Sequence, residues 1–147
     1  MSSEKVSTST LLRRLFKTAS LDRFIQRYDE SMDSVPVFHN YICDLSLAIE
    51  ISHEKIIEKS DISRTYGHQL FSGTRKPTRD RVIQLAFGFN MNYEQTQELL
   101  TIARKSSLYP KIKRDAIIIY ALTNGYDITA VQTALFDMSL PLLGEER

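Results

Sequence analysis

The sequence predicts an all-α protein with a core of five helices and additional helices at both ends. Apolar residues recur at every third or fourth position through most of the chain, which is the period of an amphipathic helix. Only five Gly and four Pro occur in 147 residues, and long periodic stretches lie between them. With 42% hydrophobic and 25% charged residues, the chain has an ordinary globular composition and is long enough to bury a core.

Residues 1–35 are predicted to form a helical extension that precedes the core. Residues 10–17 and 21–32 each carry apolar side chains at helical spacing, and Ser20 is the candidate N-cap of the second helix. These helices can pack onto the core or onto a second subunit, and their sequence does not separate the two arrangements. Only three basic residues accompany the first helix, which argues against a membrane-surface role.

The predicted core domain, residues 36–108, begins after the break in the pattern at Pro36. Its expected helices span residues 37–50, 53–60, 64–72, 79–87 and 93–104. The Ser63 hydroxyl can cap the N-terminus of the third of these helices, and Gly73 can take the positive φ that closes it. Asn92 is the candidate N-cap of the fifth.

The second and third core helices are short, and only Asp61-Ile62-Ser63 separates them. Two short helices joined by such a turn have the helix-turn-helix layout with which many proteins read DNA. An ordinary corner between two helices has the same spacing, so the layout alone supports both interpretations.

A series of short motifs follows in order across this region. They are Ser52, Ile56-Ile57, Asp61-Ile62-Ser63, the helix of residues 64–72, Gly73, Thr74-Arg75-Lys76 and Pro77. The series resembles the phage-repressor and Cro type of helix-turn-helix, the Xre-like family. In that family a polar cap, a Leu-Ala pair, a Gly-Val-Ser turn, a recognition helix, a Gly, a basic loop and a Pro follow one another. The resemblance covers roughly residues 37–104, and it rests on the order and spacing of the motifs together.

Three residues depart from the family pattern, and each departure predicts a specific contact. Ile57 stands where the family has a small Ala, and Gly67 stands where it has a branched residue on the facing helix. Large and small have exchanged places, so the volume of the contact is nearly kept and the two residues should touch. Phe71 replaces the Glu that usually precedes the closing Gly, which predicts an apolar contact in place of a buried ion pair.

The resemblance implies a transcription regulator that binds double-stranded DNA in a sequence-specific way; a repressor is favoured, and an activator is the alternative. The helix of residues 64–72 would lie in the major groove. The implied DNA-binding residues are His53, Ser63, Arg64, Thr65, His68, Gln69, Thr74, Arg75, Lys76 and Arg79.

The resemblance implies that four residues of this set contact base edges: Arg64, Thr65, His68 and Gln69. Arg suits the two acceptors of guanine, and Gln suits the donor and acceptor of adenine. His53 would touch phosphate and brace the reading helix, while the loop residues and Arg79 would hold phosphates. Alternatives remain open: Thr65 and Gln69 can be solvated, and Arg75 can pair with Asp80.

The charge distribution is uneven, although the net charge of +1 is small for a DNA-binding protein. Residues 64–81 contain five basic residues and one acid, and residues 104–114 contain five basic residues and no acid. Such clusters are typical of a phosphate-facing surface. A solvated basic face is the alternative interpretation.

The C-terminal region, residues 109–147, is predicted to be a helical hairpin that repeats the preceding one. A shift of 35 residues aligns residues 79–100 with residues 114–135 and gives six identities in 22 positions. The identical pairs are Arg79 with Arg114, Asp80 with Asp115, Ile83 with Ile118, Ala86 with Ala121, Gln97 with Gln132 and Leu100 with Leu135. The sequence therefore indicates that one αα-hairpin is used twice.

Other functional classes find little support. The single Cys43 and the dispersed His39, His53 and His68 offer neither metal-ligand spacing nor a catalytic triad. We therefore expect no enzyme, no cofactor and no metal. Apolar runs are too short for a membrane span, and the N-terminus lacks a secretory h-region, so we expect a cytoplasmic protein. The remaining alternative is a protein–protein interaction module on a repressor-like scaffold.

A homodimer is expected, because this fold usually works on two half-sites. The favoured interface is the C-terminal hairpin, residues 115–143, because it is the most apolar of the additional segments. Its candidate exposed residues are Ile119, Tyr126, Leu135, Phe136 and Met138. The alternative use of this hairpin is as a lid over the protein's own core.

Overall fold

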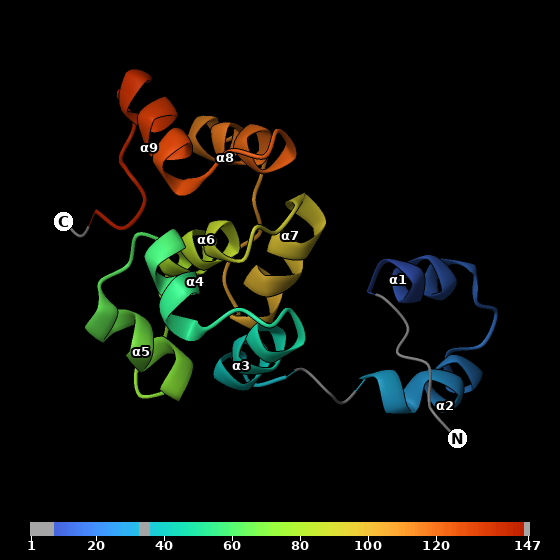
Figure 1. The fold of residues 1–147 in the computed structure, drawn as a ribbon. Coiled ribbons are helices and arrows are strands. Elements are labelled where there is room, and N and C mark those ends of the chain that lie inside the picture. Colours follow the sequence, from blue (N-terminus) through green and yellow to red (C-terminus); the bar gives the residue numbers. More distant parts are fainter. Residues whose placement is uncertain (1–7, 33–35, 146–147) are drawn as a thin grey trace. The chain divides into compact units, whose positions relative to one another are not determined.

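The computed structural model describes residues 8–32 and 36–145, and all regular structure in these residues is α-helical. The helices are α1 (Thr8–Lys17), α2 (Leu21–Met32), α3 (Phe38–Ala48), α4 (His53–Lys59), α5 (Arg64–Ser72), α6 (Arg79–Gly88), α7 (Tyr93–Ile102), α8 (Lys113–Thr123) and α9 (Ile128–Asp137) (Figure 1). The predicted all-α class is confirmed. No helix in the described ranges has the length and apolarity needed to cross a membrane.

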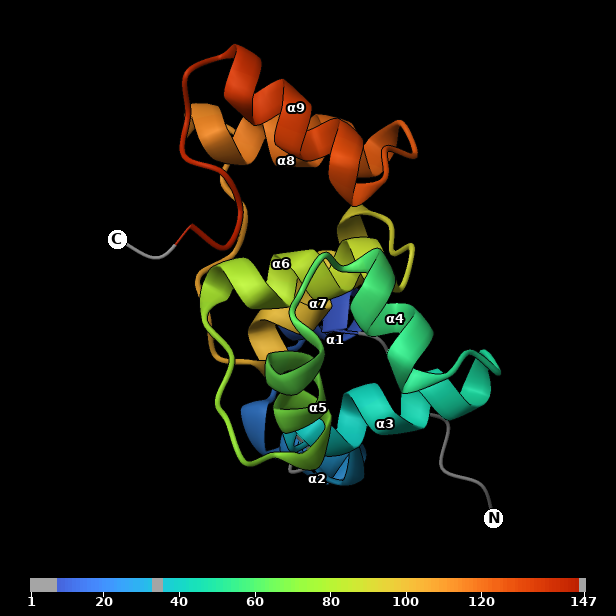
Figure 2. The same ribbon diagram turned by 60° about the vertical axis from the view of Figure 1, so that its left-hand side comes forward.

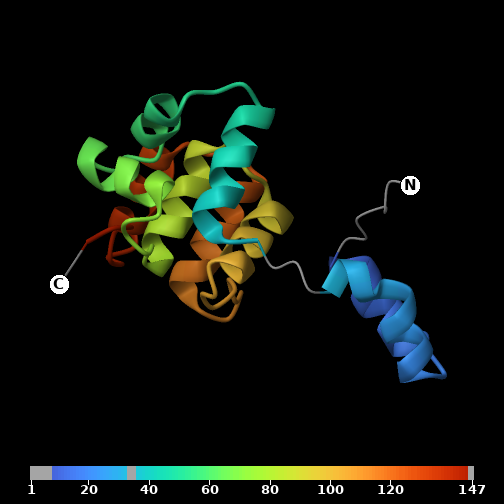
Figure 3. The same cartoon turned by 90° about the horizontal axis from the view of Figure 1, so that it is seen from below.

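The chain divides into two compact units, residues 1–35 and residues 36–147. The first unit contains α1 and α2, which lie side by side as a hairpin (Figure 3). Arg14 of α1 donates to the Tyr28 hydroxyl of α2 at 2.8 Å, and the rings of Phe24 and Tyr28 lie 4.8 Å apart. The second unit contains the other seven described helices, so the C-terminal hairpin belongs to the same compact body as the core.

Five helices of the second unit begin at a side-chain cap, and α3 and α8 begin without one. The Ser63 hydroxyl accepts from the backbone N–H of Tyr66, and Gly73 closes α5 with a φ of 80°. Asn92 and Gln95 form a reciprocal capping box at the start of α7. Each cap satisfies backbone groups that the helix itself leaves without partners. The boundaries of α5 are those that the sequence predicts.

Helix α6 is the centre of the second unit. Every residue from Val82 to Gly88 is buried, including the polar Gln84. The Gln84 amide donates to the carbonyls of Ser60 and Asp61, which end α4 (3.2 and 3.3 Å). A Cβ on Gly88 would overlap the Ser60 hydroxyl, so glycine is what allows α4 and α6 to approach this closely.

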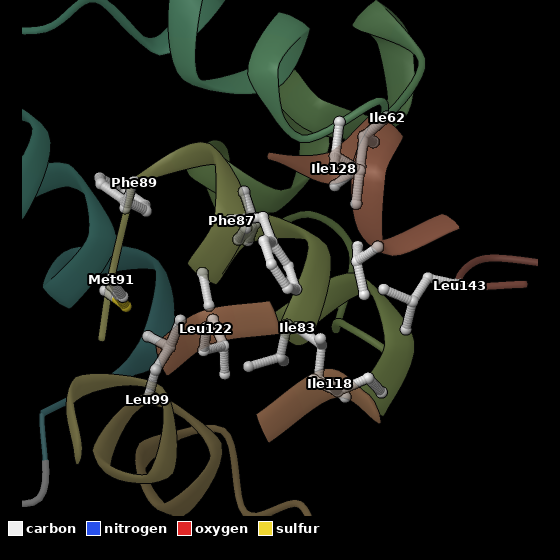
Figure 4. Close-up of a cluster of buried hydrophobic side chains, with 14 of the residues drawn as sticks. Ile62, Ile83, Phe87, Phe89, Met91, Leu99, Ile118, Leu122, Ile128 and Leu143 are labelled. Carbon is white, nitrogen blue, oxygen red and sulfur yellow. The ribbon is translucent and has the colours of Figure 1, made fainter. Parts of the chain in front are cut away.

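Apolar side chains from four helices meet on the other side of α6. Figure 4 shows Ile83 and Phe87 of α6 among side chains of α7, α8 and α9. The buried cluster includes Leu99 of α7, Ile118 of α8 and Val131 of α9, each with no exposed surface. The C-terminal hairpin therefore completes the core instead of standing apart from it.

The two 35-residue repeats are joined by ion pairs that cross between them. Arg79 of the first repeat binds Asp115 of the second with two hydrogen bonds of 2.9 and 3.0 Å. Arg114 of the second repeat binds Asp80 of the first with two bonds of 2.9 Å. The identical Arg-Asp dipeptides thus pair with each other across the repeats and not within either repeat.

The surrounding hydrogen bonds repeat with the same offset of 35 residues. Arg79 also donates to the carbonyls of Ser106 and Ser107, and Arg114 donates to those of Pro141 and Leu142. Asp115 accepts from the N–H of Tyr109, and Asp80 accepts from that of Gly144, both at 3.0 Å. Gln97 exchanges two hydrogen bonds with the backbone of Leu108, and Gln132 does the same with Leu143.

If the two repeats are exchanged, each of these contacts coincides with its counterpart in the other repeat. The two sides of a two-fold symmetric interface are related in this way. Helix contacts follow the same rule, because α6 packs on α9 and α8 packs on α7. The repeat extends beyond its first 22 aligned positions, to Leu108 and Leu143. Residues 79–109 and 114–144 therefore form an approximate two-fold pair of hairpins within one chain.

This arrangement corrects part of the expected dimer interface. Leu135, predicted as exposed, has no exposed surface and belongs to the core of the same chain. Ile119 and Tyr126 are only partly buried and pack against that core, while Phe136 and Met138 are exposed. Most of the apolar surface of the α8–α9 hairpin packs against the core of its own chain. The hairpin therefore acts as a lid, which is the alternative to a dimer interface.

The crossed pairs should make stability depend on pH in the acidic range. Burial raises the pKa of Asp80, but hydrogen bonds from Arg114 and Gly144, with the charges of Arg114 and Arg79, lower it more, so the net pKa lies below its ordinary value of 3.8. A carboxyl whose pKa is lower in the folded chain stabilises the fold above its unfolded value, and this contribution is lost as the pH falls.

We therefore expect the urea midpoint of unfolding to fall between about pH 5 and about pH 3. Asp80→Asn should be less stable than the wild type at neutral pH and should show a smaller drop over this range. An equal drop in the two chains would assign the acid sensitivity to other carboxyls.

Candidate nucleic-acid interface

Helices α4 and α5 are held together by an interlocking of a large and a small residue. A Cβ added to Gly67 of α5 would lie 2.5–2.8 Å from three side-chain atoms of Ile57 on α4. The absent side chain of Gly67 therefore makes room for Ile57, which is 3% exposed. The predicted contact between the two residues is confirmed, and it sets how closely α5 lies against α4.

The N-terminal end of α4 is fixed to α5 by an aromatic stack. The His53 ring lies 4.1 Å from the Phe71 ring, with 15° between their planes. Phe71 is buried and also lies 6.4 Å from the Phe89 ring. The expected apolar contact at Phe71 is confirmed, and His53 braces α5 through its ring face.

An open hollow beside α5 brings together four of the predicted site residues. Its lining residues are His53, Thr65, His68, Gln69, Phe71 and Ser72. Thr65 is exposed, while His68 and Gln69 are half-buried. Polar groups on α5 are thus presented to solvent on one surface, and the stacked rings of His53 and Phe71 also line it.

Glu54 places a negative charge at this surface. Its Oε1 accepts from Nη2 of Arg64 at 2.9 Å and lies 3.8 Å from Nε2 of His68. Both partners of the Arg64 pair are exposed, with 80% of the Arg64 side chain and 63% of the Glu54 side chain accessible. The pair therefore orients Arg64 at the start of α5 without burying its guanidinium.

Figure 2 shows the loop that joins α5 to α6, residues 73–78. The basic residues predicted for phosphate, Arg75 and Lys76, belong to this loop. Arg75 is exposed, and its guanidinium lies 4.5 Å from the centre of the Tyr66 ring on α5. Thr74 is exposed beside α5, with its hydroxyl 3.0 Å from that of Ser72. Lys76 is exposed and has no ion-pair partner among the described residues.

The Arg79 guanidinium is engaged in contacts within the fold. It is committed to Asp115 and to two backbone carbonyls, so the predicted phosphate contact of Arg79 is replaced by a role in the fold. The alternative partner for Arg75 is not found either, because Asp80 is bound by Arg114. Both results follow from the crossed pairing of the repeats.

Three residues of this region have roles that their sequence positions do not predict. Glu54 pairs with Arg64 across the turn, and Tyr66 carries the guanidiniums of Arg75 and Arg81 over its ring at 4.5 and 4.7 Å. Arg81 also donates to Gln84 at 3.1 Å. Opposite charges at residues 54 and 64 are visible in the sequence, but only the angle between the helices brings them together.

Comparison of the chain with models of known protein families, with curated proteins and with solved structures finds no match.

Proposed function

We propose that the chain binds double-stranded DNA in a sequence-specific way, as a transcription regulator of the repressor-like helix-turn-helix type, with α5 in the major groove. The observation that carries the proposal is the hollow beside α5, where Thr65, His68 and Gln69 are presented together with His53. Thr65, His68 and Gln69 offer hydrogen-bond donors and acceptors on one helix, as base reading in the major groove requires.

On this proposal, some residues around α5 contact bases and others contact phosphates. Gln69 can bind adenine with two hydrogen bonds, and Arg64 can bind guanine once it turns from Glu54. Glu54 repels phosphate and holds Arg64, so an Arg64–guanine contact must compete with that exposed pair. Such competition favours discrimination between sequences over strong general binding.

Phosphate contacts on this proposal come from the loop after α5. Thr74, Arg75 and Lys76 are all exposed there. The stacking of Arg75 on Tyr66 holds its guanidinium next to α5, where it is pre-organised for a phosphate beside the groove. The working unit is a homodimer, because one α5 reads too few base pairs for useful affinity at physiological salt.

Salt dependence tests the phosphate contacts. The two cations of the loop, Arg75 and Lys76, predict that log K against log salt slopes by about −2 for each bound chain. Lys76→Glu should weaken binding to all duplex sequences alike and make this slope shallower. Fluorescence anisotropy with a labelled duplex, over a series of NaCl concentrations, measures both quantities.

The matched control is Lys111→Glu, which reverses the charge of an exposed lysine before α8. It should leave the slope nearly unchanged, because Lys111 does not belong to the loop after α5. Equal losses in the two variants would mean that net charge alone governs binding. A flat salt response of the wild type would contradict the phosphate assignment.

A second candidate function is protein–protein interaction, and the engagement of arginines within the fold favours it. Arg79 and Arg114 are both held in bidentate pairs with aspartates. The number of basic residues available to bind phosphate is therefore smaller than the number of basic residues in the sequence. On this alternative the hollow beside α5 takes a side chain of a protein partner. Retention on a heparin column, with elution that depends on Lys76, favours DNA, and passage without retention favours the alternative.

A further inference from the structure

The connection between α7 and α8, residues 103–112, is fixed to the start of α6. The Arg79 guanidinium donates to the carbonyls of Ser106 and Ser107 at 3.0 and 2.9 Å. Arg79 is the first residue of α6 and directly follows the loop of residues 73–78. Its side chain therefore brings the α7–α8 connection to the end of the loop that the proposed function assigns to phosphate.

Two exposed cations, Arg104 and Lys105, directly precede the residues that Arg79 holds. Neither has an ion-pair partner among the described residues. The acids beside Arg79 are Asp80 and Asp115, and each is already paired with an arginine inside the fold. The positive charges of Arg104 and Lys105 are therefore not cancelled by these acids and face solvent.

The second repeat forms the same turn without cations. Arg104 and Ser139 occupy corresponding positions and have φ values of 57° and 58°. In both turns the next residue, Lys105 or Leu140, donates its N–H to the carbonyl five residues earlier, at 2.9 and 3.0 Å. The backbone of the turn is thus the same with and without basic side chains, so the fold does not require the two charges.

Basic residues just after a helix also interact favourably with the negative end of the helix dipole. Helix α9, the counterpart of α7, has no basic residue in its last turn, and Met138, Ser139 and Leu140 follow it. The corresponding helix end therefore forms without this contribution. The cations after α7 call for a role outside the fold.

We propose that Arg104 and Lys105 form a second phosphate-binding site for double-stranded DNA, an inference that rests on the proposed function. Exposed cations on a fixed backbone bind phosphates and carry no base specificity. Together with the loop of residues 73–78, they extend the phosphate contacts past the start of α6. Arg79 is a positioning residue here, because it holds the α7–α8 connection and touches neither base nor phosphate.

The salt dependence of DNA binding tests the inference. Two further contacts add about −2 to the contribution of Arg75 and Lys76, so log K against log salt should slope by about −4 in total for each bound chain. Arg104→Ser combined with Lys105→Gln, the neutral variant, should return the slope to about −2. Fluorescence anisotropy over a series of NaCl concentrations measures it, with a labelled mixed-sequence duplex of about 30 base pairs that holds two half-sites and their flanks.

The matched control is Lys111→Gln combined with Lys113→Gln, which removes two exposed cations from the other end of the connection, at the start of α8. It should leave the slope at about −4. Arg104→Lys combined with Lys105→Arg keeps both charges and should also retain the slope. The urea midpoint of the neutral variant should match that of the wild type, because serine already occupies the same turn in the second repeat.

The outcomes separate this inference from the proposed function. No binding of the duplex by the wild type would overturn both. Binding with equal slopes for the wild type and the neutral variant would overturn the inference alone. So would an equal loss of slope in the Lys111 and Lys113 control, which would make net charge the cause. A lower urea midpoint with an unchanged slope would assign Arg104 and Lys105 to the stability of the end of α7 and would also overturn the inference.

Discussion

Asp115→Asn should destabilise the protein by about 3 kcal/mol, a value close to that for removal of one partner from a buried ion pair. The Asp115 side chain is 2% exposed, and its two oxygens accept two hydrogen bonds from Arg79 and one from the N–H of Tyr109. Asparagine removes the charge and places an amide donor against the donors of Arg79. The guanidinium of Arg79, whose side chain is 24% exposed, then loses its counter-ion in a site that water reaches poorly.

Urea unfolding of both chains, followed by circular dichroism, measures the difference in free energy. The matched control is Glu54→Gln, which breaks the exposed pair between Glu54 and Arg64. Exposed pairs contribute little, so this change should cost less than about 1 kcal/mol. Similar small costs for the two substitutions would contradict the view that the crossed pairs hold the repeats together.

Ile57→Ala should cost about 2–5 kcal/mol, because it leaves a cavity against Gly67 at the contact between α4 and α5. Gly67→Ile should also destabilise, by about 1–3 kcal/mol, since a Cβ at this position already lies within 2.8 Å of Ile57. The gain in helix propensity on replacement of a mid-helix glycine is about 1 kcal/mol or less and offsets only part of this. The double variant restores one large and one small residue and should recover much of the loss.

A double-mutant cycle on thermal or urea unfolding measures this coupling. Strict additivity of the two changes would mean that each acts on different neighbours, against the distances between Gly67 and Ile57. Recovery in the double variant would show that the volume at this contact matters more than which helix supplies it.

Local patterns are sufficient to predict most of the helices and their ends. Ser63 and Gly73 bound α5 as their capping chemistry predicts, and the large residue at 57 with the small residue at 67 predicts the contact between α4 and α5. Such signals are readable because each depends on a few residues close in sequence or on a volume that must be conserved.

Pairing between distant segments cannot be predicted in the same way. The repeated Arg-Asp dipeptides at residues 79–80 and 114–115 are visible as identities, yet nothing local says that each arginine binds the aspartate of the other repeat. The position of Arg79 after a basic loop suggests a phosphate contact, but its role depends instead on the two-fold packing of the hairpins. The prediction for Leu135 is wrong for the same reason, since the burial of an additional hairpin depends on tertiary packing.

The most direct test of base reading by α5 is selection of bound duplexes from a random-sequence DNA library, with the wild type and Gln69→Ala in parallel. The wild type should enrich a motif with two related half-sites. Gln69→Ala should relax the preference at one base pair of each half-site, worth about 1–3 kcal/mol or about 5- to 150-fold. Lys76→Ala is the control and should lower affinity while the motif stays the same. An identical motif for the wild type and Gln69→Ala, or no enriched motif at all, would contradict base reading by α5.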